Sequence, residues 1–203
     1  MTTRPGRPPL TPILPLLAAL LLATASASAP ARADACAGIR MPESTVVGGE
    51  TLARNGMGVR QVSRLGFTVD VYVAGLYLEH PSRDAATILS TPQRWRLVLH
   101  LVRDVDREQI TDAFTRAFQR TAPDDADLQG RMARLNGWIT DVQEGGRVTF
   151  TFVPGTGLTV EVNDIRKGTV EGFDFASTFL DIWLGDHPPN PGLKGGLLGG
   201  PCA

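Results

Sequence analysis

Two runs of strand-forming residues on either side of Gly66 constrain the fold of this chain more than any other feature. The first run, 59–62, is short. The second run, 67–78, is long, and β-branched or aromatic residues recur along it at every second position. Gly66 is a typical turn residue, because glycine adopts turn conformations without steric cost. The pattern therefore predicts an antiparallel β-hairpin whose turn contains Gly66.

Strict alternation divides the second strand into two sets of side chains that face opposite sides of the sheet. These sets are Phe67, Val69, Val71 and Val73 on one face, and Thr68, Asp70, Tyr72 and Ala74 on the other. If the hairpin is symmetric about Gly66, Arg60 lies directly opposite Tyr72, because each is six residues from Gly66. Asp70 is then a diagonal neighbour of Arg60 on the same face.

Arg60 has two interpretations on this face. A guanidinium inside a cavity between sheet and helices can bind a carboxylate or enolate oxygen, and Tyr72 can donate its phenol hydrogen to the same oxygen. Alternatively, Arg60 and Asp70 form an ordinary cross-strand ion pair on an exposed face. The residues alone leave both interpretations open.

The rest of the chain carries further strand and helix patterns. Short apolar runs predict strands at 95–102, 148–153, 158–162 and 165–170, with a turn at 154–157. Helical patterns cover 84–89, a segment that opens at Asp106, a segment after Asp124 and Asp125, and 173–184, and the glycine-rich stretch 194–201 is a loop or a short helical turn. This order predicts an α+β domain, an antiparallel β-sheet with a layer of helices on one face.

Two of the predicted helices have apolar stripes. Asp106 is expected to cap the first of them, with Gln109 at the reciprocal position of a capping box. Apolar residues recur along this helix every four residues: Ile110, Phe114 and Phe118. In the last helix, Phe179 and Trp183 have the same spacing. They are either core residues or the lining of a ligand cavity, since cores and pocket walls use the same residue types.

Common signatures of catalytic and metal sites are absent from the sequence. No serine lies in a nucleophile elbow, and neither an HExxH motif nor a phosphate-binding glycine-rich loop occurs. His80, His100 and His187 are far apart and lack the spacing of metal ligands. We therefore expect no metal and no cofactor. The basic residues are scattered, so the sequence does not indicate a nucleic-acid surface.

Residues 1–33 have the pattern of a secretory signal peptide. Arg4 and Arg7 precede an apolar run at 10–23, and cleavage is expected after Ala33. A membrane anchor is the alternative, but the run is short and contains prolines, so we expect no stable membrane span. Cleavage would lower the basic count from 20 to 17 against 21 acidic residues, which gives the mature domain, 34–203, a net charge of about −4. The expected location is periplasmic or secreted.

Cys36 and Cys202, the two cysteines of the chain, lie near the two ends of the mature protein. In an oxidising compartment they could form a disulfide. Closing so long a loop would stabilise the fold by on the order of 4 kcal/mol in the chain-entropy model. Two free thiols on loosely held ends are the alternative.

Five segments together resemble the chalcone-isomerase superfamily. The first two are NGMGVR at 55–60 and VYVAGLYL at 71–78. The others follow in order: LVRDV at 101–105, VPGTG at 153–157 and IWLGD at 182–186. The resemblance covers 48–199 and is strongest to the bacterial secreted chalcone-isomerase-like group. It implies a chalcone-isomerase-like open-faced sandwich with a ligand cleft between the sheet and the helices.

The resemblance to the plant enzymes is incomplete at the active site. It implies that an arginine at the position of Arg60 binds the flavonoid and stabilises its developing charge. The other polar positions of those enzymes fall here on or near Tyr72, Arg107, Ile110, Phe114 and Ile182. Chalcone cyclisation needs an ordered polar network to orient a phenol and stabilise an enolate. The largely apolar replacements therefore argue against this reaction.

The resemblance to the fatty-acid-binding members of the superfamily is closer. In those proteins an arginine and a tyrosine from these strands hold the carboxylate, and Arg60 and Tyr72 match them. We therefore expect a non-catalytic protein that binds a fatty acid or a similar small hydrophobic carboxylate, with these two residues at the polar end of the cleft. One alternative is an intramolecular lyase in which Arg60 is the electrophilic stabiliser. The other is a structural module whose cleft is filled by its own side chains.

Overall fold

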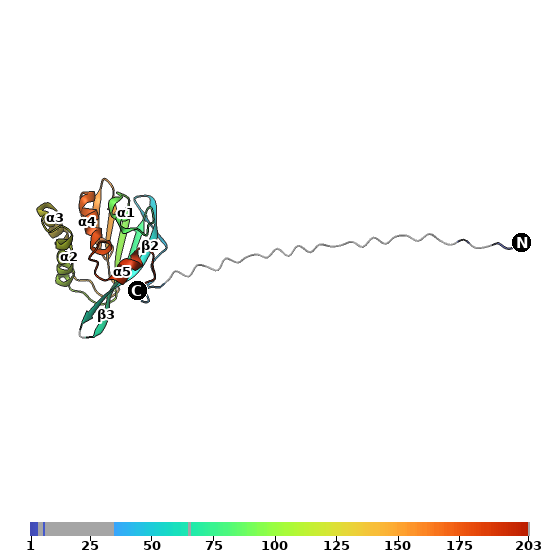
Figure 1. Cartoon of the computed structure of the whole chain (residues 1–203), viewed down its shortest axis with the longest axis horizontal. Helices are drawn as coiled ribbons and strands as arrows, with labels where there is room; N and C mark the ends of the chain where they lie inside the picture. The colour runs from blue at the N-terminus through green and yellow to red at the C-terminus, as the bar shows by residue number, and fades with distance from the viewer. Residues whose placement is uncertain (4–5, 7–34, 65, 203) are drawn as a thin grey trace. The chain divides into compact units, whose positions relative to one another are not determined.

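Among the described residues, seven strands form one antiparallel sheet in which each strand pairs with the next along the chain (Figure 1). The strands are β1 (Ser44–Val47), β2 (Glu50–Arg64), β3 (Phe67–Leu78), β4 (Trp95–Leu101), β5 (Arg147–Val153), β6 (Gly157–Val162) and β7 (Ile165–Val170). Strands that neighbour one another in sequence and in space form an antiparallel sheet, so the predicted sheet type is confirmed.

The helices pack against one face of this sheet. They are α1 (Ala85–Ser90), α2 (Arg107–Thr121), α3 (Ala126–Asn136), α4 (Phe173–Leu184) and α5 (Pro191–Leu197). Buried side chains from the sheet and helices join in one core, whose largest members include Trp95, Trp183, Phe118, Phe150 and Phe175. The predicted α+β class, with helices on one face of the sheet, is confirmed.

The structure is a computed structural model that describes residues 1–3, 6, 35–64 and 66–202. All of the helices and strands belong to one compact unit, Ala33–Ala203. The predicted signal peptide, 1–33, lies outside the described residues apart from 1–3 and 6. Within the described part of the chain, no helix has the length and apolarity needed to cross a bilayer.

The helix starts agree only in part with the capping patterns. Asp125 begins α3, and its side chain accepts a hydrogen bond from the Leu128 N–H at 2.9 Å. Asp106 is the N-cap residue of α2, as predicted, but its side chain makes no capping hydrogen bond, so that part of the prediction is wrong. Asp141 serves this helix start instead, accepting from the Arg107 N–H at 2.8 Å. A local pattern cannot reveal a cap supplied from a distant part of the chain.

Strand β2 is much longer than the pattern indicated, since it begins at Glu50 rather than near Val59. Gly56 and Gly58 interrupt the apolar alternation because helix α5 lies directly over them. A Cβ atom at Gly58 would lie 2.6 Å from the carbonyl oxygen of Leu193. These glycines therefore mark a close approach between the strand and α5, not the end of the strand.

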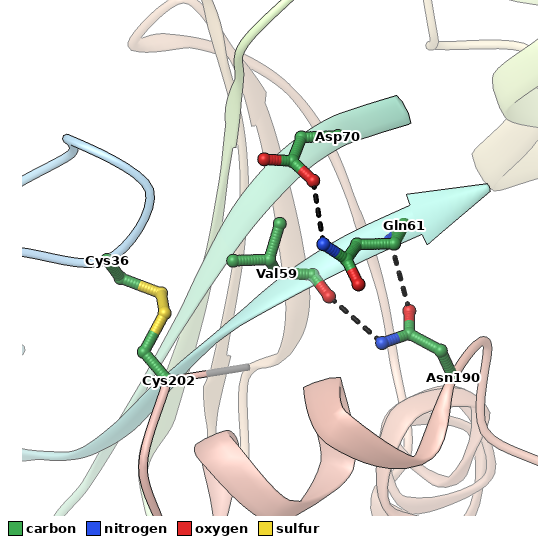
Figure 2. Close-up of a disulfide and its surroundings, with 6 residues drawn as sticks. All are labelled: Cys36, Val59, Gln61, Asp70, Asn190 and Cys202. Carbon is green, nitrogen blue, oxygen red and sulfur yellow. Dashed lines mark hydrogen bonds between the residues drawn. A yellow bond between two sulfur atoms is a disulfide. The ribbon is translucent and has the colours of Figure 1, made fainter. Parts of the chain in front are cut away.

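The segment before α5 covers a free edge of the sheet. Strand β1 pairs only with the first residues of β2, so β2 from Gly56 onward is an edge strand. The side chain of Asn190 donates to the Val59 carbonyl at 3.0 Å and accepts from the Gln61 N–H at 3.2 Å (Figure 2). This amide takes the place of a neighbouring strand at two positions, which protects the edge.

A disulfide joins Cys36 to Cys202, with Cα atoms 5.6 Å apart (Figure 2). The predicted pairing is therefore confirmed, and the alternative of two free thiols is wrong. Cys36 is buried in a small cluster with Met57, Val59 and Val73, on the sheet face opposite the helices. The N-terminal segment thus covers part of one face while α5 packs on the other, and the disulfide links them.

Candidate functional site

A cleft of about 500 Å³ lies between the sheet, helix α2 and the end of α4, and both Arg60 and Tyr72 line it. Its apolar walls come from the sheet and from α2, and include Val62, Val71, Leu99, Leu101, Ile110 and Phe114. Its charged lining residues are Arg60, Arg116 and Arg120. The cleft therefore combines apolar walls with side-chain charge of one sign, positive.

A β-bulge on β3 shapes this cleft. Arg60 pairs with Tyr72, which confirms the predicted register, but the next pair is Gln61 with Asp70. Val71 is therefore an extra residue on β3, and such a residue reverses the side-chain alternation beyond it. Val71 and Tyr72 consequently line the same cleft, although strict alternation placed them on opposite faces.

The expected position of Asp70 on the face of Arg60 is wrong for the same reason. The Asp70 carboxylate accepts a hydrogen bond from Nε2 of Gln61 at 2.9 Å (Figure 2). Arg60 instead donates through Nη1 to the backbone carbonyls of Pro189, at 2.6 Å, and Gln61, at 2.8 Å. The exposed Arg60–Asp70 ion pair, the alternative that the sequence left open, does not form.

The guanidinium of Arg60 is half-buried and has no neutralising partner in the part of the chain that the structure describes. No described carboxylate oxygen lies within 4.0 Å of its nitrogens. Both acceptors of its hydrogen bonds are uncharged carbonyls, and other guanidinium N–H groups remain as donors. A partly buried positive charge of this kind is suited to an anionic ligand.

Tyr72 presents a neutral hydroxyl to the cleft. Nε1 of Trp183 donates a hydrogen bond to the Tyr72 hydroxyl at 3.0 Å, so this oxygen is an acceptor while its own hydrogen remains to be donated. Burial raises the pKa of the Tyr72 phenol to about 12, although the Trp183 hydrogen bond and the charge of Arg60 both lower it. Tyr72 is therefore a hydrogen-bond donor at physiological pH.

Aromatic packing holds the Trp183 indole in place. Its ring centroid lies 5.8 Å from that of Phe114 and 5.3 Å from that of Phe179, both in edge-to-face geometry. Such pairs fix ring orientation. Trp183 is fully buried and also lines the cleft, so it is both a core residue and part of the cavity wall. Phe179 does not line the cleft and is a core residue.

The positions that the superfamily resemblance indicated are divided between the cleft and its surroundings. Ile110, Phe114 and Ile182 line the cleft with apolar side chains. Arg107 lies outside it, and its Nε donates to the Ile139 carbonyl at 3.0 Å. The apolar residues that stand at the polar active-site positions of the plant enzymes therefore lie in the cleft wall.

Sequence reasoning missed three contributions to the cleft. The Pro188–Pro189 pair, which follows the predicted helix 173–184, forms part of the wall and supplies a carbonyl acceptor to Arg60. Arg116 and Arg120 lie in the predicted helix that opens at Asp106, and no role was predicted for them from the sequence. Their spacing of four residues, which places them on one side of α2, is the one signal that could have indicated a shared role.

Another hollow, of about 630 Å³, lies among α1, α5 and the ends of α2 and α4. Its lining includes Asp181 and Lys194 but neither Arg60 nor Tyr72. Burial raises the pKa of the Asp181 carboxyl. Among the described residues, no three His, Cys, Asp or Glu side chains gather into a group that could hold a metal ion.

Comparison with known proteins matches residues 33–199 to the family described as "Chalcone isomerase-like". The structure is also similar to the crystal structure of a fatty-acid binding protein from Arabidopsis thaliana, with a TM-score of 0.61 and 18% sequence identity over 79% of this chain and 92% of that chain. No curated protein matches this chain. The structural likeness shows the fold, and the family match extends over most of the sequence. The chain therefore belongs to the chalcone isomerase-like family.

Proposed function

We propose that this protein binds a fatty acid or a similar hydrophobic carboxylate in the cleft, with Arg60 and Tyr72 at its polar end. The observation that carries the proposal is the half-buried guanidinium of Arg60, which no described carboxylate neutralises, beside an apolar cleft. The ligand carboxylate accepts hydrogen bonds from this guanidinium and from the Tyr72 hydroxyl. The alkyl chain lies against the apolar walls formed by the sheet and α2.

Two further observations support this ligand class. The cleft volume of about 500 Å³ falls within the range of roughly 300–1,000 Å³ that is typical of small-molecule sites. A solved structure with the same fold belongs to a plant fatty-acid binding protein. An open cleft beside Arg60 also argues against a structural module whose cleft is filled by its own side chains.

A titration with a fluorescent long-chain fatty acid tests the proposal. Arg60→Gln keeps hydrogen-bonding groups but removes the charge, so we expect the affinity to fall at least about tenfold, as for loss of a charge-assisted hydrogen bond. Arg134→Gln is the matched control, since Arg134 is an exposed residue of α3 outside the cleft. Equal affinity in wild type and Arg60→Gln would remove Arg60 from the site.

The same purified proteins distinguish binding from catalysis. Turnover of a chalcone by the wild type that is lost in Arg60→Gln would support an intramolecular lyase in place of a carrier. The apolar side chains of Ile110, Phe114 and Ile182 lead us to expect no turnover, because they leave the cleft without the polar network that cyclisation needs.

We also propose that the chain is a bacterial exported protein that works in the periplasm or outside the cell. The pattern of residues 1–33 is typical of a signal peptide, and a disulfide between Cys36 and Cys202 is suited to an oxidising compartment. N-terminal sequencing of the protein from its own cells should find Asp34 as the first residue. A protein that still begins with Met1 would contradict export by cleavage.

A further inference from the structure

The far end of the β2–β3 hairpin carries exposed apolar side chains. The end of the β2–β3 hairpin projects away from the helices (Figure 1). The strand pairs from Gln61–Asp70 onward belong to this end of the hairpin. There Phe67 is 75% exposed, Val69 39% and Val62 38%. Exposed apolar residues scattered singly are ordinary on a protein surface, but a contiguous group marks an interaction site.

These side chains share a face with the cleft. Val62 and Val69 are direct partners in the strand register, and Val62 and Val71 line the cleft. Alternation from Val71, beyond the bulge, places Val69 and Phe67 on this same side. We call these four residues, Val62, Phe67, Val69 and Val71, the hairpin surface. It forms an apolar path from the cleft to the end of the hairpin.

The charged residues that line the cleft beside this path are all basic. Arg116 and Arg120 of α2 line the cleft, and no acidic residue does. Arg116 forms an i,i+4 ion pair with Asp112, at 3.6 Å, on an exposed part of the helix. Such a pair is weak, since water screens it. The hairpin surface and the cleft that it adjoins therefore combine exposed apolar groups with basic lining residues, which is the composition of surfaces that bind anionic lipid interfaces.

The size and shape of the hairpin surface favour a bilayer over a protein partner. A stable protein interface buries about 800 Å² on each partner, and a few side chains on one narrow hairpin offer far less. Insertion into the boundary between lipid headgroups and acyl chains has no such requirement, because each apolar side chain that enters contributes by itself. The acyl phase of a bilayer is also where a fatty acid dissolves.

We propose that the hairpin surface docks on an anionic lipid bilayer, and that the hydrophobic carboxylate passes between the bilayer and the cleft along it. This inference rests on the proposed function, since it names the source of the ligand. The alkyl chain moves past Val69 and Val62 without crossing water, while Arg60 receives the carboxylate. The class of partner is a membrane surface that contains acidic phospholipid.

The test is sedimentation of protein expressed from the full-length chain with vesicles of phosphatidylcholine and phosphatidylglycerol in equal amounts. The variant Phe67→Thr with Val69→Thr keeps strand-forming residues but removes the apolar surface. We expect its vesicle affinity to fall at least about tenfold. The matched control is Val46→Thr with Ile165→Thr, which removes two apolar residues of similar exposure, 63% and 61%, outside the cleft lining. Its affinity for vesicles should equal that of the wild type.

Two outcomes would overturn docking of the hairpin surface on a bilayer. One is a wild-type protein that does not sediment with these vesicles. The other is a hairpin variant that sediments as well as the control variant. Vesicles of phosphatidylcholine alone should bind less protein, because they lack the charge that attracts the arginines; equal binding to both kinds of vesicle would contradict the preference for acidic lipid.

A parallel measurement separates this inference from the proposed function. Neither Phe67 nor Val69 lines the cleft, so the hairpin variant should bind a fluorescent fatty acid in solution with unchanged affinity. It should, however, extract that fatty acid from donor vesicles more slowly than the control variant. Vesicle binding without fatty-acid binding would reject the proposed function and retain the docking surface, and the reverse result would retain the proposed function and reject the docking surface.

Discussion

At the scale of single residues, the site depends on how two polar groups are satisfied. Arg60 is held by two uncharged carbonyls, which orient the guanidinium without neutralising it. Trp183 occupies the acceptor side of the Tyr72 hydroxyl and so leaves its hydrogen to be donated. The sequence predicted the Arg60–Tyr72 pair from symmetry about Gly66. It could not predict the partners, because Pro189 and Trp183 are more than 100 residues away along the chain.

At this scale the structure predicts that the Tyr72 phenol ionises at a higher pH than an ordinary tyrosine. Burial raises the phenol pKa from 10.0 to about 12, so the hydrogen donor persists to higher pH than in an exposed tyrosine. The chain has two tyrosines, and Tyr77→Phe leaves Tyr72 as the only one. The phenolate absorbance of this variant should appear with a midpoint near pH 12.

Trp183→Phe, combined with Tyr77→Phe, tests whether the Trp183 hydrogen bond influences the pKa of Tyr72. It removes a hydrogen bond that lowers the Tyr72 pKa, so the midpoint should move further upward. A midpoint near 10.0, the ordinary value, would show that Tyr72 is not buried as described. Because the pKa of Tyr72 is higher in the folded protein than its ordinary value, this residue also makes the free energy of unfolding depend on pH. The contribution of the neutral buried phenol to stability is complete below pH 10 and is lost as the pH rises through 12.

At the scale of elements, the hairpin shows what periodicity can and cannot reveal. A period of two predicted the strand pairing, but one extra residue at Val71 reversed the faces beyond it. A valine at a bulge looks like any other strand residue, so alternation gave no sign of the reversal. Gly56 and Gly58 lie before the predicted run at 59–62, and the pattern gave no sign that they belong to the same strand and mark its contact with α5.

The contact between β2 and α5 gives a prediction about stability. In Gly58→Ala, the new methyl group would meet the Leu193 backbone at 2.6 Å, so α5 must move. We expect the free energy of unfolding to fall by about 1–3 kcal/mol, the usual cost of overpacking. Ligand affinity should fall with it, because Pro189 precedes α5 and holds Arg60. Urea unfolding followed by circular dichroism measures the change.

Gly130→Ala is the matched control for this substitution. Gly130 lies within α3 with no atom near a new Cβ, so the change should stabilise the protein by about 0.5–1 kcal/mol through helix propensity alone. A Gly58→Ala variant that unfolds at the same urea concentration as the wild type would contradict the close packing of α5 on β2.

At the scale of the whole molecule, the segment that follows α4 completes the cleft, because Pro188 and Pro189 belong to its wall. The sequence predicted the α+β class and the Cys36–Cys202 pairing from local patterns and cysteine count. It did not reveal that the segment between α4 and Cys202 forms a cleft wall, because a Pro-Pro pair by itself indicates only that a helix stops. The disulfide holds the end of this segment to the N-terminal segment on the opposite face.

The most direct test of carboxylate binding at Arg60 and Tyr72 is a crystal structure of the protein with a saturated long-chain fatty acid. We expect the carboxylate within hydrogen-bonding distance of the Arg60 guanidinium and the Tyr72 hydroxyl, with the alkyl chain between Phe114 and the sheet. A ligand that instead occupies the hollow beside Asp181 and Lys194, or a cleft that stays empty at saturating ligand, would contradict binding in the cleft at Arg60 and Tyr72.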